Sequence, residues 1–182
     1  MKEIKIFLAS SEELKEERLV ITEMEMMLNN VLRKWNVQID VEKWEHLDSS
    51  MGIKHKQEEY NDVLEECDMC IALFWTRFGD YTKTEFELAY ERMEQGESPN
   101  NVVVYFKNSN NITPELQEFK DNFTRKYNVE TSRFSNIDTL KSYFVSEMID
   151  LCDIEELECE NIDGWLTING VKFANLNNIK IK

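Results

Sequence analysis

Hydrophobic and polar positions change period repeatedly along residues 1–152, and each change marks a predicted element. Short apolar or alternating runs, typical of buried strands, are followed by longer stretches with apolar residues at helical spacing. The predicted strands are Ile4–Ala9, Val37–Val41, Met69–Phe74, Val102–Phe106 and Val129–Phe134. The predicted helices run from a cap at Ser10 to about Trp35, and over Lys54–Glu66, Glu85–Gln95, Thr113–Arg125 and Ile137–Leu151. This alternation predicts an α/β fold, a flavodoxin-like parallel sheet with helices on both faces.

Capping signals stand before three of these helices. Ser10 followed by Glu13 fits a capping box. Thr82 or Thr84 is the expected N-cap of the third helix, with Glu85 close behind. Thr113 as N-cap and Pro114 at the first helical position begin the fourth.

The pattern changes again after residue 152. Residues 153–160 are strongly acidic and are interpreted as a linker. Asn169-Gly170 between alternating residues predicts a β-hairpin over Trp165–Phe173. Two strands alone are marginal in water, so this tail packs on the main domain, pairs with another chain or begins a further domain. We therefore expect a domain over 1–152 and an appendage over 153–182.

Composition narrows the class of protein. The chain has 182 residues, of which 42% are hydrophobic, and a net charge of −15. Such a charge is repelled by phosphate backbones and anionic lipid, which disfavours nucleic-acid and membrane partners. No apolar run approaches the roughly 20 residues of a membrane span, and no signal-peptide segment follows Met1. A cytoplasmic location is expected.

The cysteines allow two interpretations. Cys67 and Cys70 have the Cys-x-x-Cys spacing of a redox pair or of half a zinc site. Cys70, however, falls inside an apolar strand, and only His46 and His55 could supply imidazole ligands. We expect four free thiols and no metal site.

Candidate chemistry gathers after the strand Met69–Phe74. Glu85 is expected in the first turn of the following helix, just beyond the carboxyl end of the strand, where ligand clefts form in open α/β sheets. Tyr81 lies on a glycine-bearing loop, placed to stack on a planar ligand. The alternative is purely structural, because acidic residues in a first turn suit the helix dipole without any catalytic role.

Several segments together resemble a known family. Ile6–Ser11 followed by a Glu-rich helix, Ile39–Lys43 before a polar loop with Gly52, and Trp75–Ala89 resemble, in order and spacing, the bacterial TIR-like domains found at the N-termini of immune and STAND-type proteins. The resemblance covers residues 3–150. Tyr81 stands where many NAD-cleaving members have Trp, and Ser50-Met51-Gly52 lacks the proline of many BB loops.

The resemblance implies an NAD hydrolase in bacterial antiphage signalling, with NAD as substrate and no cofactor. Glu85, in a Glu-x-x-x-Ala pattern, would be the catalytic residue that stabilises an oxocarbenium-like ribose. The implied substrate-binding residues are Tyr81, Ala9, Ser10, Ser11, Trp44, Trp75 and Arg77. Self-association through the 45–53 loop and neighbouring helices would activate a homo-oligomer.

Two other functions remain open from the sequence. The chain could be a non-catalytic TIR-like adaptor, in which loop 45–53 matters and Glu85 does not. It could also resemble nucleoside 2-deoxyribosyltransferases, a related α/β fold with a nucleophilic Glu in a Thr-x-x-Glu-like region that Thr82–Glu85 fits. A covalent glycosyl-Glu85 adduct would identify that enzyme.

Overall fold

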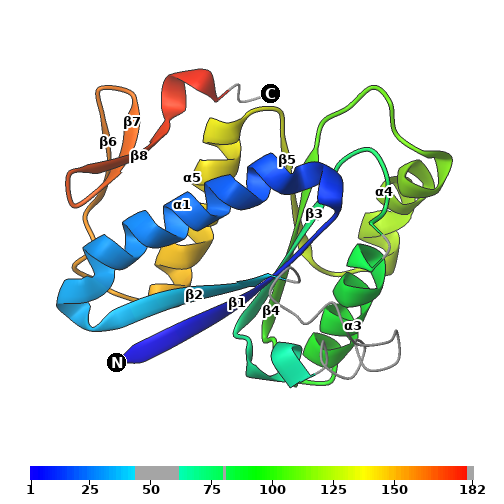
Figure 1. Ribbon diagram of the computed structural model, residues 1–182, viewed down its shortest axis with the longest axis horizontal. Coiled ribbons are helices and arrows are strands. Elements are labelled where there is room, and N and C mark those ends of the chain that lie inside the picture. Colours follow the sequence, from blue (N-terminus) through cyan, green and yellow to red (C-terminus); the bar gives the residue numbers. More distant parts are fainter. Residues whose placement is uncertain (44–61, 80, 180–182) are drawn as a thin grey trace. The chain divides into compact units, whose positions relative to one another are not determined.

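The computed structural model of the protein describes residues 1–43, 62–79 and 81–179 (Figure 1). The predicted helix Lys54–Glu66 lies mostly outside these residues, and its described part, 62–66, is helical. The loop 45–53, Trp44 and Lys54 also lie outside the described residues.

The described strands and helices follow the predicted alternation. The strands are β1 (Lys2–Ser10), β2 (Val37–Lys43), β3 (Met69–Phe74), β4 (Asn101–Lys107), β5 (Glu130–Phe134), β6 (Cys159–Ile162), β7 (Trp165–Ile168) and β8 (Val171–Asn175). The helices are α1 (Lys15–Leu32), α3 (Thr82–Glu94), α4 (Pro114–Lys126) and α5 (Ile137–Cys152). Short 3-10 helices are η1 (Glu12–Leu14), η2 (Arg33–Trp35) and η4 (Leu176–Asn178).

The first five strands form one sheet in the order β2-β1-β3-β4-β5, the flavodoxin-like order. β3 pairs in parallel with both β1 and β4, with Ser10 opposite Leu73 and Leu73 opposite Tyr105. The predicted fold class is therefore confirmed. Because parallel strands point the same way, β1, β3 and β4 end at one edge of the sheet.

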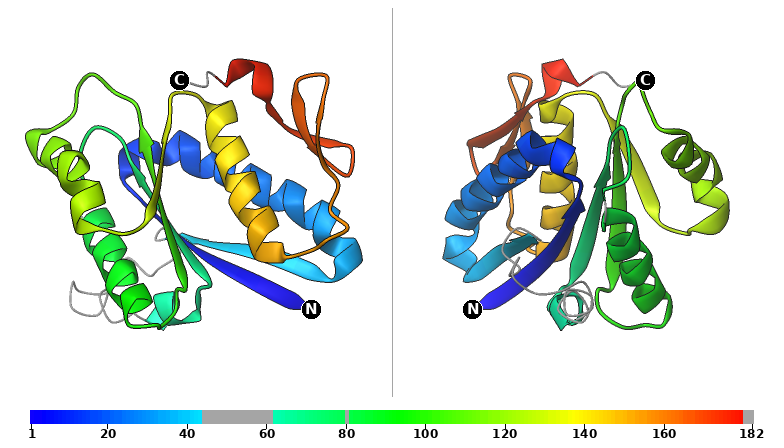
Figure 2. Two further views of the ribbon diagram at one scale, coloured as in Figure 1. Left: turned by 180° about the vertical axis from the view of Figure 1, so that it is seen from behind. Right: turned by 45° about the vertical axis from the view of Figure 1, so that its right-hand side comes forward.

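The chain divides into two compact units. One contains residues 5–15 and 41–133, and the other contains residues 1–4, 16–40 and 134–182. In the first unit, helices α3 and α4 lie beside strands β3 and β4 (Figures 1 and 2). In the second, α1 and α5 pack against each other, with Leu28 and Leu32 facing Met148 and Cys152 around a small apolar gap.

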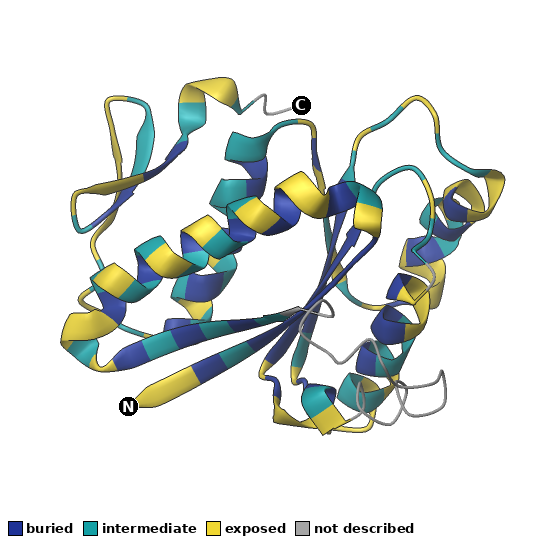
Figure 3. Cartoon of the chain, in the orientation of Figure 1, coloured by how far each residue is buried: buried dark blue, intermediate teal, exposed yellow. Residues whose placement is uncertain are grey.

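Alternate residues of β1, β3 and β4 form the core of the first unit beneath α3 and α4. The strand residues are Phe7, Ala9, Cys70, Ala72, Phe74, Val102, Val104 and Phe106. The intervening strand residues, such as Leu8, Ile71 and Val103, are buried as well (Figure 3). Burial on both faces explains the continuous apolar runs in the sequence. Aromatic rings dominate this core, with Phe119 lying 5.4 Å from Phe74 and 5.9 Å from Phe86 between ring centroids.

Two of the predicted caps are wrong in detail. The turn after β1 begins at Ser11, without a side-chain cap, and the carboxylate of Glu13 binds a distant loop instead of its own helix. Helix α3 begins at Thr82 with Tyr81 as N-cap, so Thr82 and Thr84 lie inside it. The N-cap position of Thr113 and the first-turn position of Pro114 are confirmed.

The C-terminal segment holds three antiparallel strands, in the order β6-β7-β8, where a two-stranded hairpin was predicted. The predicted turn is present, with Asn169 and Gly170 at φ values of 49° and 78°. A second turn of the same kind, at Asp163 and Gly164, adds β6, whose first residues had been assigned to the linker. This sheet packs on α5, where the Asp138 carboxylate accepts hydrogen bonds from the backbone N–H of Asn175 (2.9 Å) and from the side-chain amide of Asn178 (2.6 Å).

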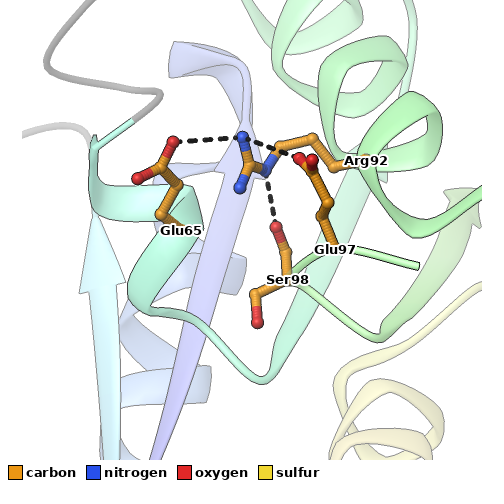
Figure 4. A network of polar contacts seen from close by, with 4 residues as sticks. All are labelled: Glu65, Arg92, Glu97 and Ser98. Carbon is orange, nitrogen blue, oxygen red and sulfur yellow. Dashed lines mark hydrogen bonds and ion pairs between the residues drawn. The ribbon is translucent and has the colours of Figure 1, made fainter. Parts of the chain in front are cut away.

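One polar network ties the connections of the first unit to α3 (Figure 4). The Arg92 guanidinium donates to the carbonyl oxygen of Ser98 at 2.6 Å and pairs with the carboxylates of Glu65 (3.3 Å) and Glu97 (3.4 Å). Arg92 thereby holds the segment before β3 and the segment before β4 against the carboxyl end of α3.

Candidate active site

A pocket of about 290 Å³ lies at the carboxyl edge of β1 and β3. Its lining comes from the turn after β1, the loop after β3 and the first turn of α3. The lining residues are Ser10, Ser11, Glu12, Arg77, Phe78, Gly79, Tyr81, Thr82 and Glu85. Because β1 and β3 are parallel neighbours, their following segments meet at the same edge, which is where ligands bind in sheets of this kind. We refer to this space as the Glu85 pocket.

Glu85 is the central ionisable group of this pocket. Its side chain lies in the first turn of α3, and the residue is only 3% exposed. Burial raises its pKa from 4.5 to about 7. The amino end of a helix favours the ionised carboxylate, so the loss of hydration outweighs the helix dipole here. Within the part of the chain that the structure describes, no cation offsets this effect.

Two contacts fix the loop that follows β3. The Glu13 carboxylate accepts hydrogen bonds from the Thr76 backbone N–H (3.0 Å), the Thr76 hydroxyl and the Arg77 backbone N–H (3.3 Å). Gly79 lies so close to the first residue of α3 and to the turn after β1 that a Cβ there would lie 2.5 Å from Thr82 Oγ1 and 3.0 Å from Ser11 Cα. The Glu13 hydrogen bonds join the turn after β1 to the start of the loop that follows β3. The close approach at Gly79 requires glycine near the end of this loop.

The structure brings together five of the eight predicted site residues: Ser10, Ser11, Arg77, Tyr81 and Glu85. Tyr81 is 37% exposed, and its carbonyl oxygen accepts the Glu85 backbone N–H at 2.9 Å. Arg77 is exposed at the pocket.

Two of the other predicted residues, Ala9 and Trp75, do not line the pocket. Ala9 is fully buried, because its side chain points into the core beneath α3 and α4. The ring of Trp75 lies 3.6 Å from Lys107 Nζ, a cation–π contact with β4 that directs it away from the pocket. Trp44 lies outside the described residues.

Four lining residues were not predicted: Glu12, Phe78, Gly79 and Thr82. Gly79 could have been predicted from the sequence, since a glycine between a buried strand and a helix often marks a close backbone approach. Phe78 packs edge-on against Phe74 (5.7 Å) and Phe119 (5.2 Å), so its ring anchors the loop in the aromatic core. Phe78 therefore supports the pocket as well as lining it.

Other candidate chemistries have less support among the described residues. All four cysteines are free thiols, and burial raises the pKa of Cys67 to about 12, which keeps this thiol protonated and unreactive. In the described ranges, no cluster of three or more His, Cys, Asp or Glu side chains is arranged to hold a metal ion. None of the described helices is both long enough and apolar enough to traverse a bilayer.

Comparison with known proteins yields limited similarity. No protein-family model matches the sequence, and no curated protein matches it. Among solved structures, the chain is similar to the CMP N-glycosidase BcmB of Clostridium botulinum, with a TM-score of 0.47 and 18% sequence identity over 81% of this chain and 98% of that chain. A similarity of this size assigns no activity, so the function must be argued from the pocket itself.

The burial of Glu85 predicts a pH-dependent effect of Glu85→Gln on stability. The folded-state pKa of about 7 lies above the unfolded value of 4.5, so the folded protein favours the protonated carboxyl. The free energy of unfolding of the wild type therefore falls relative to that of the variant as pH rises from 4.5 to about 7. Above pH 7 this difference in stability reaches its full size. A shift of this size corresponds to about 3 kcal/mol.

Urea unfolding of both proteins at pH 4.5, 6 and 8 measures this difference. Every other titrating group is common to the two proteins and cancels in the comparison. A stability difference that stays constant from pH 4.5 to 8 would show that Glu85 is not desolvated.

The Glu13 contacts predict that Glu13→Ala loosens the loop after β3. Removing the carboxylate leaves the Thr76 N–H and hydroxyl without their acceptor, a loss of about 1.5–3 kcal/mol for hydrogen bonds to a charged group. Hydrogen exchange at the Thr76 amide should therefore accelerate at least about tenfold. Glu16→Ala, at an exposed glutamate three residues later, is the matched control, and equal exchange in both variants would contradict the clamp.

Proposed function

We propose that this chain is an enzyme that hydrolyses the nicotinamide–ribose N-glycosidic bond of NAD, with Glu85 as the catalytic residue. The observation that carries the proposal is the environment of Glu85. Its carboxyl group is buried, faces a pocket and is offset by no cation among the described residues. Such a group costs stability, and strongly perturbed carboxyls in pockets are candidates for a functional role.

The charge of the substrate matches this environment. The nicotinamide ring of NAD carries a positive charge at the nitrogen bonded to ribose C1′. A cation that enters the pocket lowers the pKa of Glu85 and favours its ionised form. The carboxylate then faces the ribose carbon at which positive charge develops as the bond breaks, which is electrostatic stabilisation of the transition state.

The reaction balances without a cofactor. The C1′–N bond breaks, and its electron pair goes to the ring nitrogen, so nicotinamide leaves as a neutral molecule without needing a general acid. The ribosyl oxocarbenium ion is stabilised by the Glu85 carboxylate. Water then bonds to C1′ and loses one proton, giving ADP-ribose, nicotinamide and H⁺.

The remaining pocket residues have complementary roles in this proposal. Tyr81, at the amino end of α3, packs against the ribose or the nicotinamide ring. Ser10 and Ser11 line the opposite side after β1, where hydroxyl and backbone N–H groups can orient the ribose hydroxyls. Arg77, which is exposed and lines the pocket, is the basic group that would face the phosphates.

Activation by self-association and a role in bacterial antiphage defence remain part of the proposal. They rest on the resemblance of the sequence to TIR-like domains. The loop expected to mediate self-association, 45–53, lies outside the described residues, so this prediction stays open.

Nicotinamide release from NAD, measured at high protein concentration, tests the proposed reaction. Glu85→Gln and Glu85→Ala should reduce turnover about a hundredfold or more, the scale of losing a principal stabilising group in a transition state. Glu91→Ala, at an exposed position of α3, should retain wild-type activity. Since Glu85→Gln is expected to be at least as stable as the wild type above pH 7, lost activity in this variant does not reflect unfolding.

The outcome also separates the alternative functions. Absence of turnover in the wild type, when light scattering shows self-association, would favour the non-catalytic adaptor. Cleavage of CMP or a deoxynucleoside in place of NAD would redirect the assignment to a nucleoside or nucleotide glycosidase. A trapped glycosyl-Glu85 ester, detected by mass spectrometry, would identify a transferase with a nucleophilic carboxylate.

The raised pKa of Glu85 predicts the pH dependence of the reaction. In the free enzyme, kcat/KM should rise with pH to a plateau with a midpoint near 7, because only the ionised carboxylate stabilises the transition state. The midpoint for kcat should lie at lower pH, because the bound cationic substrate lowers the pKa of Glu85 in the complex. Steady-state profiles between pH 5 and 9 give both midpoints, and a profile that falls through pH 7 would contradict the role of an ionised Glu85.

A further inference from the structure

A second and larger pocket, of about 520 Å³, lies between α3 and α4. We refer to it as the α3–α4 pocket. Phe78 and Gly79 line this pocket as well as the Glu85 pocket, so one short stretch of loop separates the two spaces. All described residues of both pockets belong to the same compact unit. A ligand longer than a single nucleoside could therefore occupy both.

The α3–α4 pocket has an aromatic floor. Phe119 and Tyr127 are 9% and 5% exposed, and their ring centroids lie 5.7 Å apart. Asn122 on α4 and Thr84 on α3 add hydrogen-bonding groups at its sides. The planes of these two rings are inclined at 53°, so the floor consists of two tilted rings and not of a flat platform. A nucleobase can pack its face against such aromatic surface and turn its polar edge to a neighbouring amide.

Charges are distributed unequally around this pocket. Lys83 on α3 is exposed, with Nζ 5.2 Å from the Phe78 ring centroid. Lys126 on α4 is paired with Glu87 at 3.2 Å, and Glu115 and Glu118 are exposed on the α4 side. An anion is therefore favoured on the α3 side, where Lys83 lies across the Phe78–Gly79 stretch from Arg77.

The volume of the Glu85 pocket also indicates that a dinucleotide would need space beyond this pocket. About 290 Å³ is just below the roughly 300–1,000 Å³ typical of small-molecule pockets. NAD consists of two nucleosides joined by a diphosphate, and this space suits only its nicotinamide riboside portion.

Building on the proposed function, we propose that the α3–α4 pocket binds the adenosine half of the dinucleotide. The diphosphate crosses the Phe78–Gly79 stretch between Arg77 and Lys83. The adenine ring lies on the floor formed by Phe119 and Tyr127, with Asn122 at its polar edge. The α3–α4 pocket would thus determine specificity for a dinucleotide without taking part in bond cleavage.

A pair of substitutions at one exposed position tests this assignment. Glu118→Trp places a large ring in the α3–α4 pocket, whereas Glu118→Gln removes the same charge without filling it. Each variant is assayed with NAD and with nicotinamide mononucleotide, which has the same scissile bond but lacks the adenosine half.

We expect Glu118→Trp to raise KM for NAD at least about tenfold, and to leave kcat for NAD and both constants for nicotinamide mononucleotide unchanged. Glu118→Gln should lower KM for NAD slightly, because a negative charge beside the pocket is lost, and it should not raise it. Lys83→Ala should raise KM for NAD about fivefold, a loss at the upper end of the range for an exposed ion pair. Lys141→Ala on α5, which lines neither pocket, should have no effect.

The two proposals fail in different ways. One outcome is that the wild type cleaves both substrates while Glu118→Trp leaves both KM values unchanged or raises both equally. That result would overturn the adenosine site, and the catalytic role of Glu85 would stand. If the wild type cleaves neither substrate, the proposed function itself fails.

Adenosine monophosphate provides an independent test with the wild-type protein. It should inhibit NAD cleavage competitively and leave the cleavage of nicotinamide mononucleotide unaffected. Competitive inhibition of both reactions would place the inhibitor in the Glu85 pocket and would overturn the separate adenosine site.

Discussion

Parallel pairing of β1 with β3 is the constraint on which the candidate site depends. Ser10 lies opposite Leu73, so the two strands end together and their following segments must share one edge of the sheet. Glu13 and Gly79 then adapt these segments to each other, one by accepting backbone N–H groups and the other by lacking a side chain. A slip in register would separate the Ser10–Ser11 side of the pocket from Glu85, even with both loops otherwise intact.

Glutamates in the same unit show why Glu85 is exceptional. Glu13 is buried only in part and satisfies three donors. At Glu87, burial raises the pKa, but hydrogen bonds from Tyr127 and Lys126 outweigh it and hold the pKa below its usual value. Glu85 is buried, but no hydrogen bond or ion pair from the described residues lowers its pKa again. Folding gains little from such a group, and natural sequences break local rules of this kind mainly at functional sites. This contrast favours a ligand-directed role over the purely structural interpretation of a first-turn acid.

The sequence predicted the sheet well, because strands buried on both faces leave continuous apolar runs, as in Met69–Phe74. It also predicted the turn at Asn169-Gly170, where local chemistry determines conformation. It missed β6 because all four residues of that strand are exposed, so no alternation marks it, although Asp163-Gly164 is a turn signal.

Within the candidate site, local patterns predicted the positions of Glu85 and Tyr81 after β3 but could not predict tertiary contacts. Glu13 has the spacing of a capping box, yet its carboxylate is taken by a loop 63 residues away. Trp75 follows the strand as expected of a pocket wall, but Lys107 on the neighbouring strand holds its ring elsewhere. The α3–α4 pocket is equally invisible from sequence, since its lining comes from two helices and a loop whose packing depends on the aromatic core.

A net charge of −15 would seem to oppose an anionic substrate. Net charge, however, describes the field far from the surface, whereas salt screens interactions beyond about 8 Å at physiological ionic strength. Close to the pockets the order of charges matters more. Glu85 lies in the first pocket, and Arg77 and Lys83 lie on either side of the Phe78–Gly79 stretch that the two pockets share. NAD has the complementary order, with a cationic ring at the scissile bond followed by an anionic diphosphate. An acidic protein with this order of charges would therefore favour the proposed substrate over a simple polyanion, because the end of NAD that would reach Glu85 is the positively charged one.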